Sequence, residues 1–584
     1  ANSQSVLNHV LIQFAGDRAL YLEGATPTLV DVKIANSSGF PISTDGNALP
    51  DLGAEIDIDD NPFGGIEIRS GTLTEEYVEW PDQDLVYVVS GPLEVGSNTT
   101  LVVMPDTIVK FWHAPRSDPP GLVVRGLLKA DKVQFTSVYD SRDEMGGVTY
   151  REARDPAPGD WAGIGFYESS DKSYLRGCLI QYAGQRGGRS TTGSVSMVAS
   201  SPELTEVTIA DGIWYPLSAD ADSFPVLEDV KLVSNDPGDA LEIRGGTAVT
   251  GRNKYVWGPI GGEPQIVRVI RGEVVVEPDA TLIIEPGAVI KFEENGKLTV
   301  RGTLNAVGGE NDSERIVFTS LRDADYGGDT DKATSPQDKR TWGGIVFEST
   351  DESSVLQNCI VRYAPITLDD AGPRLIDNLF IESESAPIWA SPGALPELRG
   401  NRLEDNGVNG LAIWKAELRD DQVWSRLGEG DDQLVRVLAG EVTVAEGAVL
   451  SIEPGVIVKG GTADAKLRIR GGLRVMGQED NPVVFTSLND DSVGGDTNSK
   501  LAGADAGDWP GIEVAADASV LFSHAIIRYA QNGLFLRGTN APVIEGWLRV
   551  TEGKNALQCE GELRMPSTFR AEGNEVNEVV CTTE

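Results

Sequence analysis

Short runs in which apolar and polar residues alternate are the dominant pattern along this chain. The segment GLVVRGLLKA, which begins at Gly121, is typical, and Val and Ile are abundant in such runs. Gly, Pro, Asn and Asp interrupt them every few residues, so the pattern predicts short strands separated by turns. No helix-period segment is longer than about two turns, and long strands joined by hairpin turns are scarce. The chain is therefore predicted to be all-β.

A module that recurs along the chain is the second pattern. Its first block reads LVYVVSGPLEV, IVRVIRGEVVV and LVRVLAGEVTV in three successive copies. The same anchors follow each block, namely a lysine (Lys110, Lys291, Lys459), FTS (Phe135, Phe318, Phe485), a tryptophan (Trp161, Trp342, Trp509) and YA (Tyr182, Tyr363, Tyr529). We expect a partial N-terminal module at 1–80, full modules at 81–257, 258–424 and 425–550, and a C-terminal cap or docking tail at 551–584.

Strands this short, and this similar from one module to the next, predict a solenoid. Each strand would pair with its counterpart one turn further along, and inward Val, Ile and Leu would form a continuous core. If a turn takes roughly 22–26 residues, the chain makes about 23–26 turns. Trp80, Trp257 and Trp424 precede the first strand of each module, where we expect them to pin the module junctions.

The order of these anchors resembles a known group of repeats. The series TL-x-I-x-PG-x-x-V-KF, L-x-V-x-G-x-L-x-A, FTS, GGDT, W-x-GI and YA resembles the right-handed parallel β-helix repeats of large bacterial surface and secreted proteins, in the pectate-lyase-like superfamily. The resemblance covers nearly the whole chain and implies a right-handed parallel β-helix. It implies no single function, because that fold serves lyases, hydrolases, adhesins and structural rods alike.

The charge of the chain narrows the possible partners. Ninety acidic residues stand against 49 basic ones, which gives a formal charge of -41. Such a surface repels nucleic acid and anionic membranes, and no stretch approaches the ~20 apolar residues of a membrane helix. We expect an extracellular or cell-surface protein with no nucleic-acid partner and no membrane insertion. The acidity suits divalent cations, or it is simply a solvated acidic surface.

The four cysteines fall into two kinds. Cys178 and Cys359 occupy one module position that also accepts Val and Ala, which predicts a small buried slot and no reactive thiol. Cys559 and Cys581 flank the C-terminal tail, outside the repeat positions, and we expect a disulfide between them.

The loop after FTS carries the candidate metal ligands. It reads LRDADYGGDTDK in one module and LNDDSVGGDTNSK in the next, and acidic oxygens around a Gly-Gly hinge suit calcium. The predicted ligands are Asp323, Asp325, Asp329, Asp331, Asp490, Asp491, Asp496 and Asn498. The alternative is a solvated acidic turn. The corresponding SRDEMGGVTY loop lacks the downstream ligands and should bind calcium weakly or not at all.

No catalytic residues are predicted. The three histidines lie at unrelated positions, and no nucleophile elbow or metal-type His cluster is present. The lysine and tryptophan anchors recur in every module, which favours structural roles over catalysis or carbohydrate stacking.

These observations predict a non-catalytic, extracellular structural or adhesive protein of a cell surface, surface layer, sheath or filament, stabilised by calcium. The alternative is a polysaccharide-active or polysaccharide-binding protein of the same fold. We also expect self-association end to end or with a surface polymer, since Val6, Leu7, Val10 and Ile12 would lie in a strand with no preceding turn.

Overall fold

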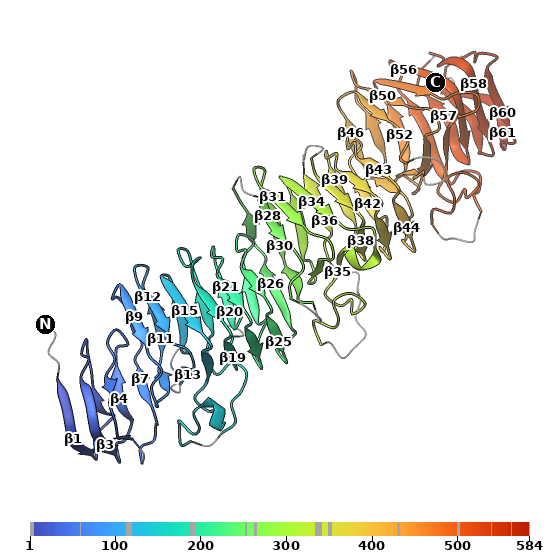
Figure 1. Ribbon diagram of the computed structural model, residues 1–584. Helices are drawn as coiled ribbons and strands as arrows, with labels where there is room; N and C mark the ends of the chain where they lie inside the picture. Colours follow the sequence, from blue (N-terminus) through green and yellow to red (C-terminus); the bar gives the residue numbers. More distant parts are fainter. Residues whose placement is uncertain are drawn as a thin grey trace.

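The chain forms a parallel β-solenoid of about 22 turns, drawn out into a rod whose two termini lie near opposite ends (Figure 1). The computed structural model describes residues 5–582 except 59, 113–118, 153, 186–192, 252–253, 262–264, 333–341, 349–352, 429–432, 499–502, 539 and 562, with the backbone alone for 578–582. Helical structure among these residues is confined to two 3-10 turns, Asp143–Met145 and Asp312–Glu314. The predicted all-β solenoid is confirmed.

The number of turns is slightly below the expected 23–26, and the long loops explain the difference. After β16 (Gln134–Ser137) the chain leaves the coil and re-enters it only at β17 (Ile164–Phe166). A similar number of residues separates β35 (Ile316–Ser320) from β36 (Ile345–Glu348). These residues lengthen the chain without adding a turn.

Each regular turn contributes three short strands that pair in parallel with the next turn. In one such turn, β10 (Tyr87–Val89) pairs with β13 (Ile108–Phe111), and β12 (Thr100–Val103) pairs with β15 (Leu127–Asp131). Burial alternates along β12, so Leu101 and Val103 point inward. This alternation is what the sequence pattern required of a strand with one face in the core.

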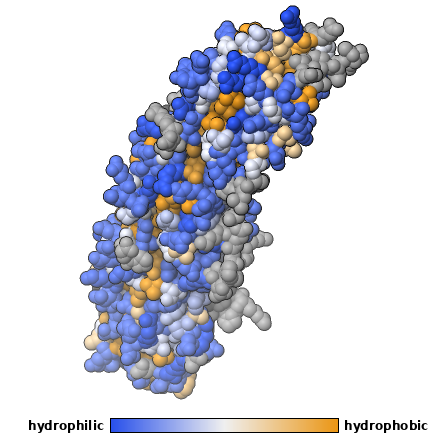
Figure 2. Space-filling view, turned by 90° about the vertical axis from the view of Figure 1, so that its right-hand side faces the viewer, coloured by the Kyte–Doolittle hydropathy of each residue, from blue (hydrophilic) through white to orange (hydrophobic). Residues whose placement is uncertain are grey.

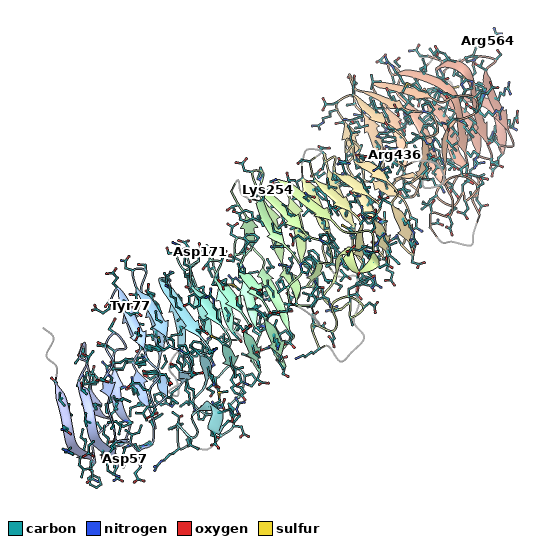
Figure 3. The ribbon with its side chains drawn as sticks, viewed as in Figure 1. Asp57, Tyr77, Asp171, Lys254, Arg436 and Arg564 are labelled. Carbon is teal, nitrogen blue, oxygen red and sulfur yellow. The ribbon has the colours of Figure 1, made fainter. Side chains whose placement is uncertain are left out.

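Apolar side chains fill the inside of the coil as one continuous cluster that runs the length of the rod. Ladders of like residues build it, for example Val109, Phe135 and Ile180 on successive turns. Charged side chains such as Asp171 and Lys254 lie on the outside (Figure 3). In the view of Figure 2 the surface is mostly hydrophilic, with apolar residues gathered in a narrow line along the rod.

Among the described residues, one sheet runs unbroken across each module junction. At the second junction β26 (Ala240–Arg244) stacks on β23 (Leu217–Ala219), a strand of the second sheet of the preceding module. It is followed by β29 (Val267–Arg271), which belongs to the first sheet of the new module. The sheets that end at β24 (Val226–Glu228) and β25 (Lys231–Val233) do not continue into the new module. Separate sheets begin there with β27 (Thr247–Val249) and β28 (Lys254–Trp257).

The other two junctions have the same arrangement, in which β7 (Ile66–Ile68) or β45 (Leu411–Ile413) pairs with a strand of each module. The second sheet of one module thereby becomes the first sheet of the next. Backbone pairing across a junction is thus carried by one sheet, whereas the regular turns inside a module have three. A junction therefore needs additional contacts to be as rigid as those turns.

A tryptophan is buried at each junction, at Trp80, Trp257 and Trp424. The backbone carbonyl oxygen of the residue after each tryptophan accepts a hydrogen bond from a side chain of the next turn. The donors are the Tyr87 hydroxyl (to Pro81, 2.8 Å), the Arg268 guanidinium (to Gly258, 2.6 Å) and the Arg436 guanidinium (to Ser425, 2.6 Å). Tyrosine and arginine thus perform one structural task at a single module position.

The cysteines occupy two kinds of position, as the sequence indicated. Cys178 and Cys359 are buried free thiols. Cys559 is disulfide-bonded, and the parallel pairing of β59 (Asn555–Glu560) with β61 (Val576–Thr582) sets it opposite Cys581. The side chain of Cys581 lies outside the described residues, so the pairing itself stays a prediction.

Within the described ranges, no helix is both long and apolar enough to cross a membrane.

Candidate functional site

A buried lysine lies under each loop that follows an FTS segment. We call the described parts of these loops, residues 138–152, 321–332 and 488–498, the junction loops. Lys110, Lys291 and Lys459 are the third residues of β13, β32 (Val289–Phe292) and β51 (Ile457–Gly460), between inward neighbours. Alternation therefore directs them out of the coil, yet all three are fully buried. The junction loop covers each one.

Each ammonium group is held by oxygens of its junction loop. Two carbonyl oxygens accept hydrogen bonds from the Nζ atom, one from the first loop aspartate and one from the second glycine of the Gly-Gly pair. These bonds join Lys110 to Asp140 and Gly147 (2.7 and 2.9 Å), Lys291 to Asp323 and Gly328 (2.8 and 2.5 Å), and Lys459 to Asp490 and Gly495 (2.9 and 2.9 Å). Lys291 and Lys459 also donate to the hydroxyls of Thr330 and Thr497.

Burial has an electrostatic cost that these oxygens offset. It lowers the pKa of Lys110 and of Lys459 to about 8. Moving an ammonium ion out of water costs several kcal/mol unless polar partners replace the water. At pH 7 the groups remain mostly charged, so the carbonyl oxygens face a cation. The loop is shaped around that cation.

The Gly-Gly pair bends the loop toward the lysine. Both glycines adopt positive φ in all three loops, for example 66° and 71° at Gly327 and Gly328. A Cβ atom on Gly327 would lie 2.2 Å from the side chain of Val267, and the equivalent glycines at 146 and 494 meet Val86 and Val435 in the same way. Glycine is therefore required here by both backbone conformation and close approach.

The first loop aspartate is fixed by a threonine and an arginine. The threonine of FTS donates to its Oδ2 atom in every module, from Thr136 to Asp140 (2.8 Å), Thr319 to Asp323 (2.6 Å) and Thr486 to Asp490 (2.5 Å). Burial alone would raise the pKa of Asp490. Hydrogen bonds from Ser492 and Thr486 and the nearby Arg528 guanidinium lower the pKa by more than burial raises it. The net pKa lies below its ordinary value, so this carboxylate is ionised.

The arginine that contacts the first loop aspartate comes from different sequence positions in different modules. Arg362 reaches Asp323 (2.9 Å), and Arg528 reaches Asp490, from the strand position just before the YA pair. The equivalent residue in the earlier module is Gln181. There Arg142, within the loop itself, donates to both oxygens of Asp140 (2.8 and 2.7 Å) and to Gln181 (2.5 Å). A guanidinium group thus lies beside this aspartate in all three modules.

The junction loops reach back across the module junctions. Their apolar side chains pack on outward residues of the continuous sheet, as Leu321 does with Val267 and Val289. Backbone bonds run from Gly64 to the Thr149 carbonyl (2.8 Å) and from Asn409 to the Thr497 carbonyl (2.7 Å). At the second junction the Lys332 ammonium donates to the carbonyl of Asn235. Each loop therefore ties its own module to the preceding one.

The predicted calcium ligands differ in their exposure to solvent. Asp323 and Asp490 are buried beside arginine, Asp331 is half-buried, and Asn498 is buried with its amide donating to Asn489. The remaining ligands, Asp325, Asp329, Asp491 and Asp496, are exposed. In the part of the chain that the structure describes, no group of three or more His, Cys, Asp or Glu side chains is placed to hold a metal ion. Calcium binding by these residues stays a prediction.

The three tryptophans after the loops anchor the return to the coil. Trp161, Trp342 and Trp509 are buried, and each indole N–H donates at 2.8 Å to the carbonyl just before the YA pair. Trp161 stacks on Phe111 and Trp342 on Phe292, with ring centroids 3.9 and 4.1 Å apart. Their burial leaves no ring face for carbohydrate stacking.

Sequence reasoning identified the lysines as structural positions but missed what they hold. The available signal was an outward strand position that carries lysine in all three modules, each time followed by an FTS segment and a Gly-Gly loop. A solvated lysine has no reason to recur with that loop, whereas a lysine that organises the loop must.

Comparison with known proteins yields no match to this chain among family models, curated proteins or solved structures. Its assignment to a parallel β-solenoid therefore rests on its own structure.

Loss of a buried ammonium should open its junction loop. Lys459→Met leaves two carbonyl oxygens and the Thr497 hydroxyl without their donor, at a cost of about 2–3 kcal/mol to loop closure. We expect faster hydrogen exchange at the amides of residues 490–498 and faster proteolysis there. Lys415→Met, at an exposed position, is the matched control. Unchanged exchange in Lys459→Met would show that the lysine does not close the loop.

The arginine relocation predicts a rescue. Arg142→Gln should lower the free energy of unfolding by about 2 kcal/mol, because Asp140 stays buried with only Thr136 as a side-chain partner. Adding Gln181→Arg should restore most of the loss, since Arg362 and Arg528 serve the other modules from that position. Urea denaturation of both variants and of Gln181→Arg alone measures this. A double variant no more stable than Arg142→Gln would contradict the equivalence.

Proposed function

We propose that this chain is a non-catalytic structural or adhesive rod of an extracellular or cell-surface assembly, such as a surface layer, sheath or filament. The observation that carries the proposal is the set of three junction loops, each closed over a buried lysine and tied across a module junction. A rod that transmits force or sets a distance needs its junctions to be as stiff as its coil. These contacts supply that stiffness where only one sheet is continuous.

The distribution of polar groups supports the same proposal. The side chains that could perform chemistry, namely lysine, aspartate and arginine, recur in every module and are engaged in holding the loops. An active site would be expected to occur once and to leave its reactive groups facing a substrate. The acidic surface fits an exported protein that must stay soluble at high local concentration.

Electron microscopy of the purified protein tests the structural role. We expect straight rods of uniform length, alone or joined end to end or along a surface polymer, with little bending at the junctions. Antibody labelling of intact cells should reach the protein from outside. Flexible or compact particles, labelling only after permeabilisation, or turnover of a polysaccharide substrate would contradict the proposal.

Calcium stabilisation is a separate part of the proposal. If the exposed carboxylates of Asp329 and Asp496 help to bind calcium, a chelator should lower the melting temperature and added calcium should restore it. Asp329→Ala with Asp496→Ala should remove most of that response. A melting curve that a chelator leaves unmoved, with no metal found by elemental analysis, would exclude calcium and leave the lysines as the only cations that close these loops.

A further inference from the structure

The third module junction has an open hollow of about 570 Å³ on its outer surface. Asp369 and Gly393 line it from two successive turns, and Trp414, Asp420 and Gln422 line it from the turn that follows. The other two junctions carry different residues at the aligned positions, and those differences show what has been removed here.

A polar side chain that forms a bridge at the other two junctions is missing at the third. In the aligned segments TDGNALP, ADADSFP and ASPGALP the fourth residue is Asn47, Asp222 or Gly393. Asn47 accepts a hydrogen bond from the backbone N–H of Thr74 (2.7 Å). Asp222 likewise accepts one from the backbone N–H of Thr250 (2.8 Å). Gly393 has no side chain that could form this bridge, so the place stays open.

Polar groups around the hollow lack partners. A Cβ atom on Gly393 would lie 3.8 Å from the Nε2 atom of Gln422, so this amide faces the space that the bridge leaves. The Oε1 atom of Gln422 is buried without a hydrogen-bond partner. The carboxylates of Asp369 and Asp420 form no ion pair among the described residues. Because buried polar groups normally find a partner, the unpaired amide points to a ligand.

Aromatic rings near the continuous sheet are paired with arginine at the other two junctions. The Arg69 guanidinium lies 4.0 Å from the ring centre of Tyr21, and the Arg271 guanidinium lies 4.5 Å from that of Trp214. The aligned segments IEIRSG and LAIWKA put Trp414 where the first junction has Arg69. The side chain of Trp414 is partly exposed and has no ring or cation contact among the described residues. The third junction thus has the ring without the guanidinium group.

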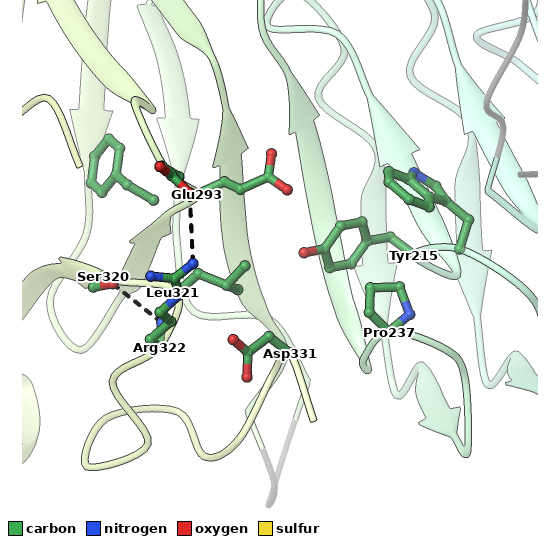
Figure 4. A pocket seen from close by; sticks show the side chains of 10 residues that line it. Tyr215, Pro237, Glu293, Ser320, Leu321, Arg322 and Asp331 are labelled. Carbon is green, nitrogen blue, oxygen red and sulfur yellow. Dashed lines mark hydrogen bonds and ion pairs between the residues drawn. The ribbon is translucent and has the colours of Figure 1, made fainter. Parts of the chain in front are cut away.

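The second junction shows the same chemistry with the guanidinium group supplied by the chain. Its cavity of about 300 Å³ is lined by Trp214, Tyr215 and Pro237 and, from the next module, by Glu293 (Figure 4). Arg271 pairs with Glu293 (2.7 Å) and lies over the ring of Trp214. The carboxylate and the ring therefore already share a cation there.

The charge around the third-junction hollow favours a cation. One guanidinium group lines it, that of Arg419, and it is bound to Glu417 (3.2 Å). The other carboxylates that line it, which have no cation of the chain beside them within the described ranges, belong to Asp369, Asp370 and Asp420. A guanidinium ion suits this surface better than an ammonium ion, because it is planar, stacks on aromatic rings and is less strongly hydrated.

From the missing bridge, the uncovered ring of Trp414 and the unpaired carboxylates of Asp369 and Asp420, we infer that this hollow binds a guanidinium group, carried by an arginine residue of another polypeptide or by a small guanidinium compound. The group stacks on Trp414 and donates to the two carboxylates. It also donates to the amide oxygen of Gln422, which a rotation of that amide brings to the hollow. The inference goes beyond the structural role and does not depend on it, because it assigns a ligand to one junction.

Titration calorimetry of the full chain tests the inference, in about 150 mM salt to screen diffuse surface charge. The probes are agmatine and Nα-acetyl-arginine methylamide, which mimics an arginine residue, and we expect one saturable site per chain. Trp414→Leu should weaken binding about tenfold, and Asp369→Asn about fivefold. Asp405→Asn is the matched control: it removes an exposed aspartate of the same module that does not line the hollow, so affinity should be unchanged.

A second variant separates loss of the site from loss of the fold. Gly393→Asn restores the residue that forms the bridge at the first junction, and the φ of Gly393 lies outside the left-handed region, so asparagine fits the backbone there. We expect this variant to fill the hollow and abolish binding without lowering the melting temperature. A folded Gly393→Asn protein with unchanged affinity would overturn the inference.

The two probes distinguish the sources of the guanidinium group. Binding of agmatine alone identifies a small compound, whereas binding of the arginine methylamide identifies an arginine residue, and either result supports the inference. Nα-acetyl-lysine methylamide should bind about tenfold more weakly, and methyl glucoside should not bind. No saturable binding of either probe, equal affinity for the lysine compound, unchanged affinity in both Trp414→Leu and Asp369→Asn, or binding of the glucoside in place of the probes would overturn it.

Discussion

A buried ammonium group that must be surrounded by oxygen atoms is the constraint on which the outer structure of this rod depends. Three lysines point outward from the coil and are fully buried. Water cannot solvate them, so the chain folds back to supply carbonyl oxygens from the loop. That requirement places the Gly-Gly bend, and the bend brings the loop against the valines of the continuous sheet. Charge therefore determines the path of a segment that has almost no regular secondary structure.

The junction loops matter because the coil is weakest where modules meet. Inside a module three sheets connect each turn to the next, whereas one sheet crosses each junction. A parallel coil gains its stiffness from the number of continuous ladders, so a junction would act as a hinge without other contacts. The loops span this point with backbone bonds and an apolar cluster of their own. Modular growth of the rod and its rigidity are thereby compatible.

Much of the fold could be predicted from the sequence, because it follows from periodicity. Strand alternation, the module repeat and the absence of helical segments suffice to predict a parallel solenoid, and residues such as Leu101 and Val103 lie inside as alternation requires. The change of sheet at a module junction could not be predicted, because the sequence of β26 resembles that of any other strand. Only its pairing with β23 shows the change. The role of the acidic loops was also hidden. Carboxylates near a Gly-Gly hinge suit calcium, and calcium binding stays a prediction. The sequence did not reveal that these loops also enclose a lysine from a strand some 30 residues earlier, as the separation of Lys291 from Asp323 shows.

The relocated arginine explains why residue patterns alone give an incomplete account of the site. Asp140 has its guanidinium from Arg142, two residues along the chain, whereas Asp323 has it from Arg362 on the next turn. A comparison of aligned positions would report Gln181 as a lost interaction, although the charge pair is intact. The constraint acts on the position of charge in space, and the sequence meets it in more than one way.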